Sequence, residues 1–345
     1  MLDLSPFNYH LPASSIAQEP LADRAGARML VLDRAAERWG DRMFRDFPGY
    51  LRTGDCLVLN DSKVFPSRLL GHRVGVHSLP VGKRNPKRHE NLSGEVEVFL
   101  LEPVSADART WTALVHPGRK IRVGERIRFP DTEAEIVARG EFGERTVRFD
   151  HSGDMYQLFD RIGHVPLPPY IKRTDSPADR ERYQTVFARQ TGSVAAPTAG
   201  LHFTPEILEQ CRDTGAEIAY VTLHVGLGTF QPVRGDSLHA ERFEVNEQNA
   251  AIIRRANRVI CAGTTSVRAV ESLYLGRTHQ TDLFIRPGFE FQRTNAMLTN
   301  FHLPESSLFI LACAFAGREF VLSAYQYAVE AGYRFYSYGD CMLIL

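Results

Sequence analysis

Three histidines of this 345-residue chain, His202, His224 and His302, each stand in a loop that follows an apolar segment. The imidazole side chain ordinarily changes its charge close to neutral pH, so histidines in such loops are candidates for general acid and base catalysis. A single histidine in a loop is more often a structural hydrogen-bonding residue. The repeated placement favours a shared catalytic site over three separate structural roles.

The loops belong to one pattern in the second half of the chain: an apolar strand, a loop rich in His, Thr, Ser and Gly, and then a helix. Its four copies cover residues 192–215, 216–229, 258–276 and 296–317. In the first copy SVAA (193–196) is the predicted strand, and Thr204, Pro205 and Gly215 mark the start and end of the predicted helix. The carboxyl ends of strands in an open α/β sheet form its ligand-binding crevice. We therefore expect the three histidines to converge there.

The turn of the third copy has the residue types of an anion-binding site. It reads GTTS (263–266) and joins the predicted strand 258–262 to a helix. The free N–H groups of a helix start, together with the hydroxyls of Thr264, Thr265 and Ser266, suit a carboxylate or a phosphate. The alternative is that these hydroxyls only cap the helix.

The composition excludes several classes of protein. The 41 basic and 41 acidic side chains cancel, so any nucleic-acid contact needs local patches of charge. The five cysteines are scattered and show no paired spacing, so we expect neither disulfides nor a metal site. We find no targeting signal and no apolar run long enough to span a bilayer, and we expect a cytoplasmic protein. Walker, GxGxxG, HExxH and nucleophile-elbow motifs are absent from the sequence.

The sequence pattern of residues 67–150 differs from that of the rest of the chain. They consist of short alternating strands separated by turn residues, which is typical of a small antiparallel β-barrel. We therefore predict an α/β catalytic domain formed by residues 1–66 and 151–345, interrupted by an inserted barrel domain, 67–150. Arg119 and Lys120 belong to a basic cluster in the barrel that suits phosphate contact, or else a solvated charged face.

Long motifs spread over nearly the whole chain carry a resemblance to one family. They include GDCLVLNDSKVFPSRL (54–69), GHVPLPPYIKR (163–173), VAAPTAGLHFT (194–204), VTLHVGLGTFQPV (221–233), GTTSVRAVES (263–272), TNFHLPESSL (299–308) and the terminal YRFYSYGDCMLIL. Together these motifs closely resemble the S-adenosylmethionine:tRNA ribosyltransferase-isomerases of queuosine biosynthesis.

The resemblance implies a reaction in which S-adenosylmethionine donates its ribosyl group, while adenine and methionine leave. The implied acceptor is the aminomethyl group of 7-aminomethyl-7-deazaguanine at the wobble position of tRNA, and the product is epoxyqueuosine. The resemblance also implies an α/β domain with an inserted β-barrel. We expect a monomer whose partners are tRNA and S-adenosylmethionine, with no metal and no membrane.

This chemistry assigns roles to the candidate residues. A proton must leave the 5′ carbon beside the sulfonium and adenine must depart protonated, so His202, His224 and His302 become acid and base candidates, with the base left open. The candidates for the methionine carboxylate are Thr264, Thr265 and Ser266, with Arg268 as a second anion contact. Further candidates for substrate binding are Thr198, Gly200, Gly226, Gly228, Thr229 and Asn300, with Asn60 and Asp61 for the ribose or for the domain junction. Candidates for tRNA phosphates are Lys172, Arg173 and Arg286, beside Arg119 and Lys120.

Two other functions stay open at this point. A methyltransferase would use the same crevice and release S-adenosylhomocysteine, although the Gly-rich first turn of the commonest methyltransferases is missing. A non-catalytic RNA-binding module would use the barrel and the basic loops while the histidines are structural. The chain also departs from the family pattern in shorter stretches near 234–243 and 272–281.

Overall fold

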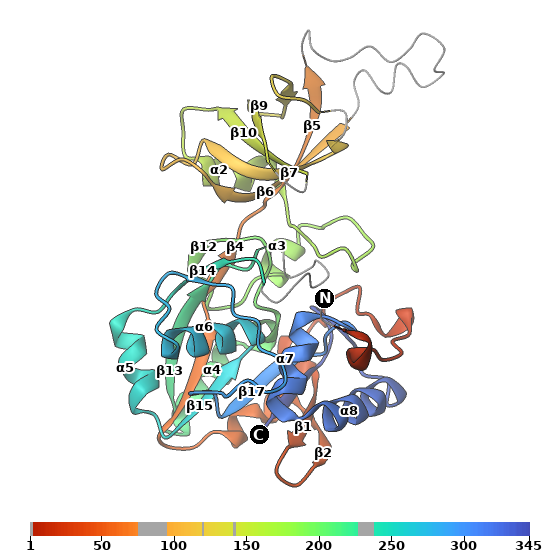
Figure 1. Ribbon diagram of the computed structural model, residues 1–345, viewed down its shortest axis with the longest axis vertical. Helices are drawn as coiled ribbons and strands as arrows, with labels where there is room; N and C mark the ends of the chain where they lie inside the picture. The colour runs from red at the N-terminus through yellow and green to blue at the C-terminus, as the bar shows by residue number, and fades with distance from the viewer. Residues whose placement is uncertain (1–2, 75–94, 119–120, 141–142, 227–237) are drawn as a thin grey trace. The chain divides into compact units, whose positions relative to one another are not determined.

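The computed structural model describes residues 3–74, 95–118, 121–140, 143–226 and 238–345 (Figure 1). The chain divides into two compact units. The α/β unit comprises Met1–Lys63 and Leu167–Leu345, and the barrel unit comprises Val64–Pro166. The expected fold class, an α/β domain interrupted by a small antiparallel barrel, is confirmed.

The described part of the α/β unit is built on a nine-stranded mixed sheet with the order β16-β14-β13-β3-β15-β17-β18-β1-β2. The strands are β1 (Arg28–Asp33), β2 (Arg38–Met43), β3 (Asp55–Asn60), β13 (Glu217–Leu223), β14 (Glu241–Glu244), β15 (Arg258–Ala262), β16 (Gln280–Thr281), β17 (Ala296–Asn300) and β18 (Cys341–Ile344). The neighbours β13, β3, β15 and β17 are mutually parallel. Their carboxyl ends therefore meet at one edge of the sheet, where the segments that follow them lie close together.

Helices cover both faces of this sheet. The described helices of the α/β unit are α3 (Asp179–Arg182), α4 (Pro205–Asp213), α5 (Glu247–Arg255), α6 (Thr264–Tyr274), α7 (Ser307–Ala316) and α8 (Arg318–Glu330), with short 3-10 turns η1 (Ser5–Phe7), η2 (Ala13–Ser15), η3 (Arg24–Gly26), η4 (Phe44–Tyr50) and η6 (Thr198–His202). Along β3, Cys56 and Val58 join a core with residues of α5 to α8, whereas Leu57 and Leu59 join a second core with residues of α4 and η4. Residues 56–59 of β3 are all apolar because both faces of this strand are buried.

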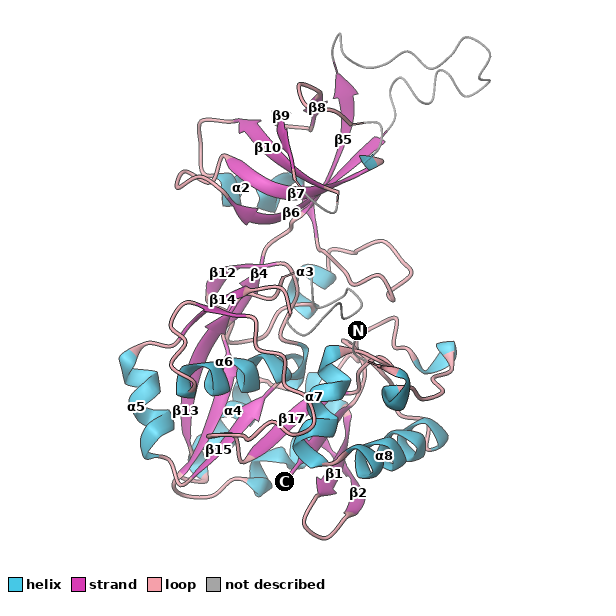
Figure 2. Ribbon diagram, in the orientation of Figure 1, coloured by secondary structure: helices cyan, strands magenta, loops and turns pink. Residues whose placement is uncertain are grey.

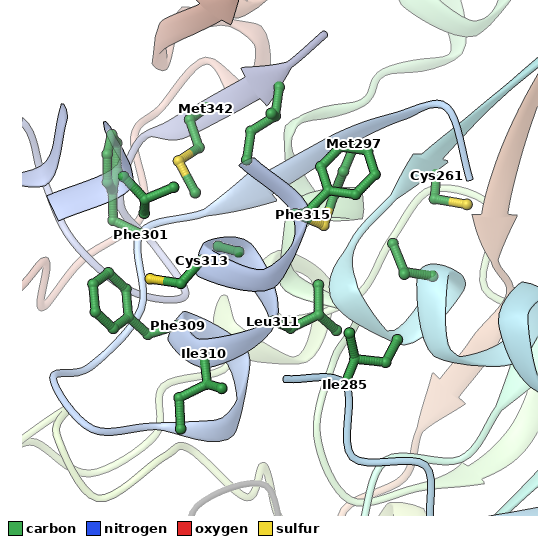
Figure 3. Packing of buried hydrophobic residues seen from close by; sticks show 14 of the residues in the cluster. Cys261, Ile285, Met297, Phe301, Phe309, Ile310, Leu311, Cys313, Phe315 and Met342 are labelled. Carbon is green, nitrogen blue, oxygen red and sulfur yellow. The ribbon is translucent and has the colours of Figure 1, made fainter. Parts of the chain in front are cut away.

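Helix α7 is apolar nearly all round its circumference, as expected for a helix inside a core. Figure 3 shows Phe309, Leu311 and Cys313 of α7 in the cluster that also contains Met297 of β17 and Met342 of β18. No single helix among the described residues has the length and hydropathy to cross a membrane. Helices α7 and α8 have that length and hydropathy only when they are taken together, and the chain bends by 117° between them.

Strands β13, β15 and β17 confirm the strands predicted in the last three copies of the repeated pattern. The first copy differs, because its strand, β12 (Gln190–Ser193), ends where the predicted one begins and pairs with β4 (Ser62–Val64) in a separate small sheet. Residues 194–196 form a buried loop, and the segment is joined to Val225, which follows β13: Val225 N–H donates to Ser193 Oγ over 2.9 Å and Val194 N–H donates to the Val225 carbonyl over 3.1 Å. The prediction of a main-sheet strand there is wrong. The helix that follows is confirmed, with Thr204 capping α4 and Gly215 at φ +83° behind it.

The barrel unit contains a sheet with the order β11-β5-β6-β7-β10-β9-β8 that closes through a β5–β8 pairing (Figure 2). Its strands are β5 (Arg68–Val74), β6 (Glu95–Pro103), β7 (Thr110–His116), β8 (Arg126–Arg128), β9 (Glu133–Arg139), β10 (Glu144–Asp150) and β11 (Gly163–His164). Side chains along these strands alternate between buried and exposed, as they do in a small closed barrel.

The barrel unit extends beyond the strand region to which sequence analysis assigned it. Helix α2 (Met155–Ile162) begins at the Asp154 cap and belongs to this unit. Its Phe159 packs edge to face against Trp111 and Phe149, at ring distances of 5.4 Å each. The apolar face of α2 therefore completes the barrel core. The amphipathic sequence of α2 predicts a buried face but does not say which of the two units buries it.

Glu271 of α6 fixes the segment that enters β17. Its side chain is fully buried, and its carboxylate accepts hydrogen bonds from the N–H groups of Gln292 (2.6 Å), Arg293 (3.1 Å) and Thr294 (2.8 Å), and from the Thr294 hydroxyl (2.7 Å). A buried carboxylate satisfied by several donors is a strong constraint on the backbone that supplies them.

We predict that Glu271→Ala lowers the free energy of unfolding by about 3 kcal/mol, because buried N–H groups lose a charged acceptor. Chemical denaturation followed by circular dichroism measures the change. Glu247→Ala is the matched control, since Glu247 is exposed and pairs with Arg254 at the surface, and its loss should change stability by less than about 0.5 kcal/mol. Equal effects of the two substitutions would contradict the anchoring role.

Candidate active site

A pocket opens at the carboxyl ends of β15 and β17 in the α/β unit. It encloses about 700 Å³, including the space open to solvent at its mouth. The lining consists of residues 195–199, 263–265 and 299–303, together with Tyr170, Tyr183, Val225, Ser306, Leu308, Tyr336 and Ser337. Among the described residues, no Asp, Glu, Lys or Arg lines it. A mostly apolar pocket of this size suits a nucleoside-sized ligand that meets only a few polar groups.

The start of helix α6 forms one polar end of the pocket. Gly263 follows β15 with φ +95°, a conformation that glycine adopts without a steric cost, and as N-cap it has no side chain to bind the first N–H groups of the helix. Thr264 and Thr265 line the pocket. Ser266 does not, because its hydroxyl donates back to the Ala262 carbonyl over 2.8 Å. The first N–H groups of the helix and the helix dipole give this end the chemistry that suits an anion.

His302 lies in the pocket wall directly after β17. Its Nε2 is 2.7 Å from Thr299 Oγ1, and its carbonyl accepts a hydrogen bond from the Tyr9 hydroxyl. Burial lowers the pKa of His302 to about 3, because the interior disfavours the charged imidazolium. The ring is therefore neutral at physiological pH.

His202 lies behind the pocket wall and reaches it through Asn300. Its Nε2 is 3.3 Å from Asn300 Oδ1, and the Asn300 amide donates to the Tyr336 carbonyl over 2.8 Å. Burial is the main cause that lowers the pKa of His202 to about 4. Asn300 itself lines the pocket, so the protein places the amide, and not this imidazole, against a ligand.

His224 follows β13, but only its neighbour Val225 lines the pocket. The His224 ring lies against Gly192, where an added Cβ would come within 3.0 Å of it. Its Nδ1 is buried and has no hydrogen-bond partner among the described residues. Burial, helped by the charge of Arg242, lowers the pKa of His224 to about 4. The three histidines thus lie in three different environments. Of the three, His302 lines the pocket, whereas His202 and His224 do not.

Of the other substrate-binding candidates, Thr198 lines the pocket, whereas several form the scaffold around it. Arg268 is buried in an ion pair with Glu241, whose other oxygen accepts the Gly226 N–H over 2.9 Å. The Asn60 amide donates to the Leu223 carbonyl (3.0 Å) and to Thr265 Oγ1 (3.2 Å). Asn60 therefore positions the residue at the helix start rather than facing a ligand.

Asp61 and Gly200 also stand outside the pocket lining. Asp61 accepts a hydrogen bond from the Thr222 hydroxyl over 2.6 Å, and burial raises the pKa of this carboxyl. Gly200 packs so tightly that a Cβ would come within 2.7 Å of Thr185. The candidates Gly228 and Thr229 lie outside the described residues.

The proposed phosphate-binding residues differ in their exposure to solvent. Arg173 is held by Asp179 through two hydrogen bonds, of 2.7 and 2.9 Å, and pairs with Glu19. Lys172 and Arg286 are exposed. Arg119 and Lys120 lie outside the described residues.

Sequence analysis missed the tyrosines of the pocket wall. Tyr170 and Tyr336 stack with ring centroids 4.4 Å apart, and the Tyr170 hydroxyl is 2.6 Å from Ser337 Oγ. Aromatic residues in apolar stretches resemble core residues in a sequence. The only available signal was their place in the motifs PPYIKR and FYSYGD, which are unusually polar for core segments.

The described residues contain no group of three or more His, Cys, Asp or Glu side chains that could hold a metal ion. All five cysteines are buried and free. The described pocket can thus offer a ligand a helix start, a neutral imidazole, an amide and aromatic surfaces. These groups can bind an anionic end and a planar ring, and can accept a proton.

The fold and the pocket define an α/β protein with an inserted β-barrel and a nucleoside-sized pocket at the ends of parallel strands. The chain belongs to the queuosine biosynthesis protein family, whose model matches residues 4–344. A relative from Solibacter usitatus, named S-adenosylmethionine:tRNA ribosyltransferase-isomerase, is 65% identical and covers 100% of both chains. One of the same name from Lachnoclostridium phytofermentans is 44% identical, covering 98% of this chain and 96% of its own.

A solved structure agrees with these relatives. The crystal structure of an S-adenosylmethionine tRNA ribosyltransferase from Thermotoga maritima matches with a TM-score of 0.54 and 34% sequence identity. The match covers 99% of this chain and 100% of that chain. The family that the sequence motifs indicated is therefore confirmed.

Burial of three neutral histidines predicts that the protein loses stability on acidification. The folded state keeps the rings of His202 and His224 neutral down to about pH 4 and that of His302 to about pH 3, whereas the unfolded chain protonates them near pH 6.5. Between these values the unfolded state binds more protons, so the free energy of unfolding falls as the pH drops below 6.5. Each ring contributes a slope of up to about 1.4 kcal/mol per pH unit.

Urea denaturation at pH 7, 6 and 5 measures this slope. We expect His302→Gln to reduce it by about 1 kcal/mol per pH unit, since one titrating ring is removed. His279→Gln, which removes an exposed ring, serves as the control and should leave the slope unchanged. An identical slope in wild type and His302→Gln would show that the His302 ring is not buried as a neutral group.

Proposed function

We propose that this chain transfers and isomerises the ribosyl group of S-adenosylmethionine onto 7-aminomethyl-7-deazaguanine at the tRNA wobble position. The product is epoxyqueuosine-tRNA, and adenine and methionine are released. The proposal is supported by full-length similarity to relatives named for this reaction. The observation that carries it is the pocket whose uncapped α6 start faces a nucleoside-sized space.

In this proposal the methionine carboxylate of the donor binds at the start of α6. The N–H groups of Thr264 and Thr265 and their hydroxyls are the donors, and the helix dipole favours the negative charge. Asn60 supports this end by holding the Thr265 hydroxyl. Arg268 stabilises the same region through Glu241 and Gly226, and it acts on the ligand only indirectly.

His302 is the histidine that we propose takes part in proton transfer. It lines the pocket, and its neutral ring is able to accept the proton that leaves the 5′ carbon beside the sulfonium. His202 acts as a positioning residue because it holds Asn300. His224 supports the β13 side of the pocket against Gly192.

For tRNA, we propose that exposed Lys172 and Arg286 contact phosphates, whereas Arg173 stabilises the loop that carries Lys172. Two further basic residues of the barrel, Arg126 and Arg128, already have acidic partners, since both pair with Glu133 and Arg126 also pairs with Asp150. We also propose that the chain acts in the cytoplasm as a monomer and uses neither a metal nor a membrane.

Incubation with S-adenosylmethionine and tRNA bearing 7-aminomethyl-7-deazaguanine tests the proposal. We predict adenine and methionine release matched by epoxyqueuosine, measured by liquid chromatography and mass spectrometry. His302→Ala should lower the rate about 100-fold or more, because a positioned acid or base contributes that much. His279→Ala, at an exposed histidine, should keep the wild-type rate.

Each other outcome has a distinct meaning. Release of S-adenosylhomocysteine would identify a methyltransferase instead. Binding of tRNA without release of adenine would identify an RNA-binding module. If the wild type turns over and His302→Ala has the same rate, the proposed reaction would still be supported, but His302 would have no part in it.

A further inference from the structure

Tyr336 lies in the pocket wall in a backbone conformation that is rare for an aromatic residue. Its φ is +71°, in the left-handed region that crowds a bulky side chain. Three hydrogen bonds hold it there: its N–H donates to the Phe301 carbonyl (3.2 Å), and its carbonyl accepts from Asn300 Nδ2 (2.8 Å) and from the Gly339 N–H (2.9 Å). Unfavourable backbone conformations that are held in this way are concentrated at functional sites.

The side chain of Tyr336 carries a second unfavourable feature. The residue is 5% exposed, and its hydroxyl has no hydrogen-bond partner in the described part of the chain. The neighbouring Tyr170, against which the ring stacks, differs because its hydroxyl pairs with Ser337. A buried hydroxyl without a partner costs stability, so its presence in a pocket wall needs an explanation.

The strand order places Tyr336 away from the anion-binding end of the pocket. Gly263 follows β15, Asn300 ends β17, and Tyr336 precedes β18, which is the next strand in the sheet. Neighbouring strands lie about 4.8 Å apart, so β15 and β18 are separated by roughly 10 Å. A ligand with a carboxylate at one end and a purine at the other fits such a pocket with the carboxylate at Gly263 and the purine toward Tyr336.

We propose that Tyr336 recognises the nucleobase of the donor, its hydroxyl donating a hydrogen bond to a ring nitrogen of the purine. The inference rests on the proposed function. Since the hydroxyl is covered in the structure, ligand binding must tilt the Tyr336 ring until the hydroxyl faces the pocket. Burial raises the pKa of Tyr336, so the hydroxyl stays protonated and acts as a donor. Ring nitrogens of adenine are acceptors, and a donor bound to one also stabilises adenine as it leaves.

Tyr336→Phe tests this role because it removes only the hydroxyl and keeps the ring in the same backbone conformation. Isothermal titration compares three probes: S-adenosylmethionine, 5′-methylthioadenosine, which has the nucleobase without the amino acid, and methionine, which has the reverse. We expect the Kd of the two adenine-containing probes to rise about 2- to 10-fold, the value of one hydrogen bond, while that of methionine is unchanged.

Thermal unfolding of the free protein provides a second readout. Tyr336→Phe should not lower the melting temperature, because the lost hydroxyl had no partner. Tyr333→Phe is the matched control, since the Tyr333 hydroxyl donates to Asp41 over 2.6 Å outside the pocket. This control should lower the melting temperature and leave all three Kd values unchanged.

Two results would overturn the inference while the proposed function stands: wild-type affinity of Tyr336→Phe for 5′-methylthioadenosine, or an equal loss of affinity for methionine. A wild-type protein that binds none of the three probes would overturn the proposed function and this inference with it.

Discussion

The buried amide of Asn300 is the interaction on which the pocket depends. It stands at the end of β17, binds His202 with its oxygen, and binds the Tyr336 carbonyl with its nitrogen. Three segments far apart in the sequence are thereby joined at the sheet edge. A buried side-chain amide must satisfy both its donors and its acceptor, so its partners can move little relative to one another. These hydrogen bonds fix the backbone of the pocket wall, including the unfavourable backbone conformation of Tyr336.

Much of the fold could be predicted because local patterns carried the information. The apolar runs of β13, β15 and β17 and the Thr204 and Gly215 signals around α4 are all present in the structure. Two features depended on distant contacts and were not predictable in this way. Ser193 and Val194 form hydrogen bonds with Val225 and do not enter the main sheet, and α2 belongs to the barrel unit, where Phe159 packs on Trp111.

The candidate site was less predictable than the fold, for a physical reason. A polar residue at a strand end faces either a ligand or a neighbouring backbone, and the sequence does not distinguish the two. Thr264, Thr265, Asn300 and His302 line the pocket, whereas Asn60 and Arg268 have their hydrogen-bonding groups directed to protein partners. Such buried scaffold contacts hold the helix start and the adjacent loop in place. The tyrosines went unnoticed because they combine a core-like ring with a polar hydroxyl.

The central claim is that the donor binds with its methionine carboxylate at the start of α6. A crystal structure of the chain with S-adenosylmethionine tests this most directly. We expect a carboxylate oxygen within about 3 Å of the Thr264 or Thr265 N–H, the hydrogen-bond distance for such a pair, and the ribose beside Asn300 and His302. A donor bound elsewhere, or bound in this pocket with its carboxylate away from Gly263, would contradict the account.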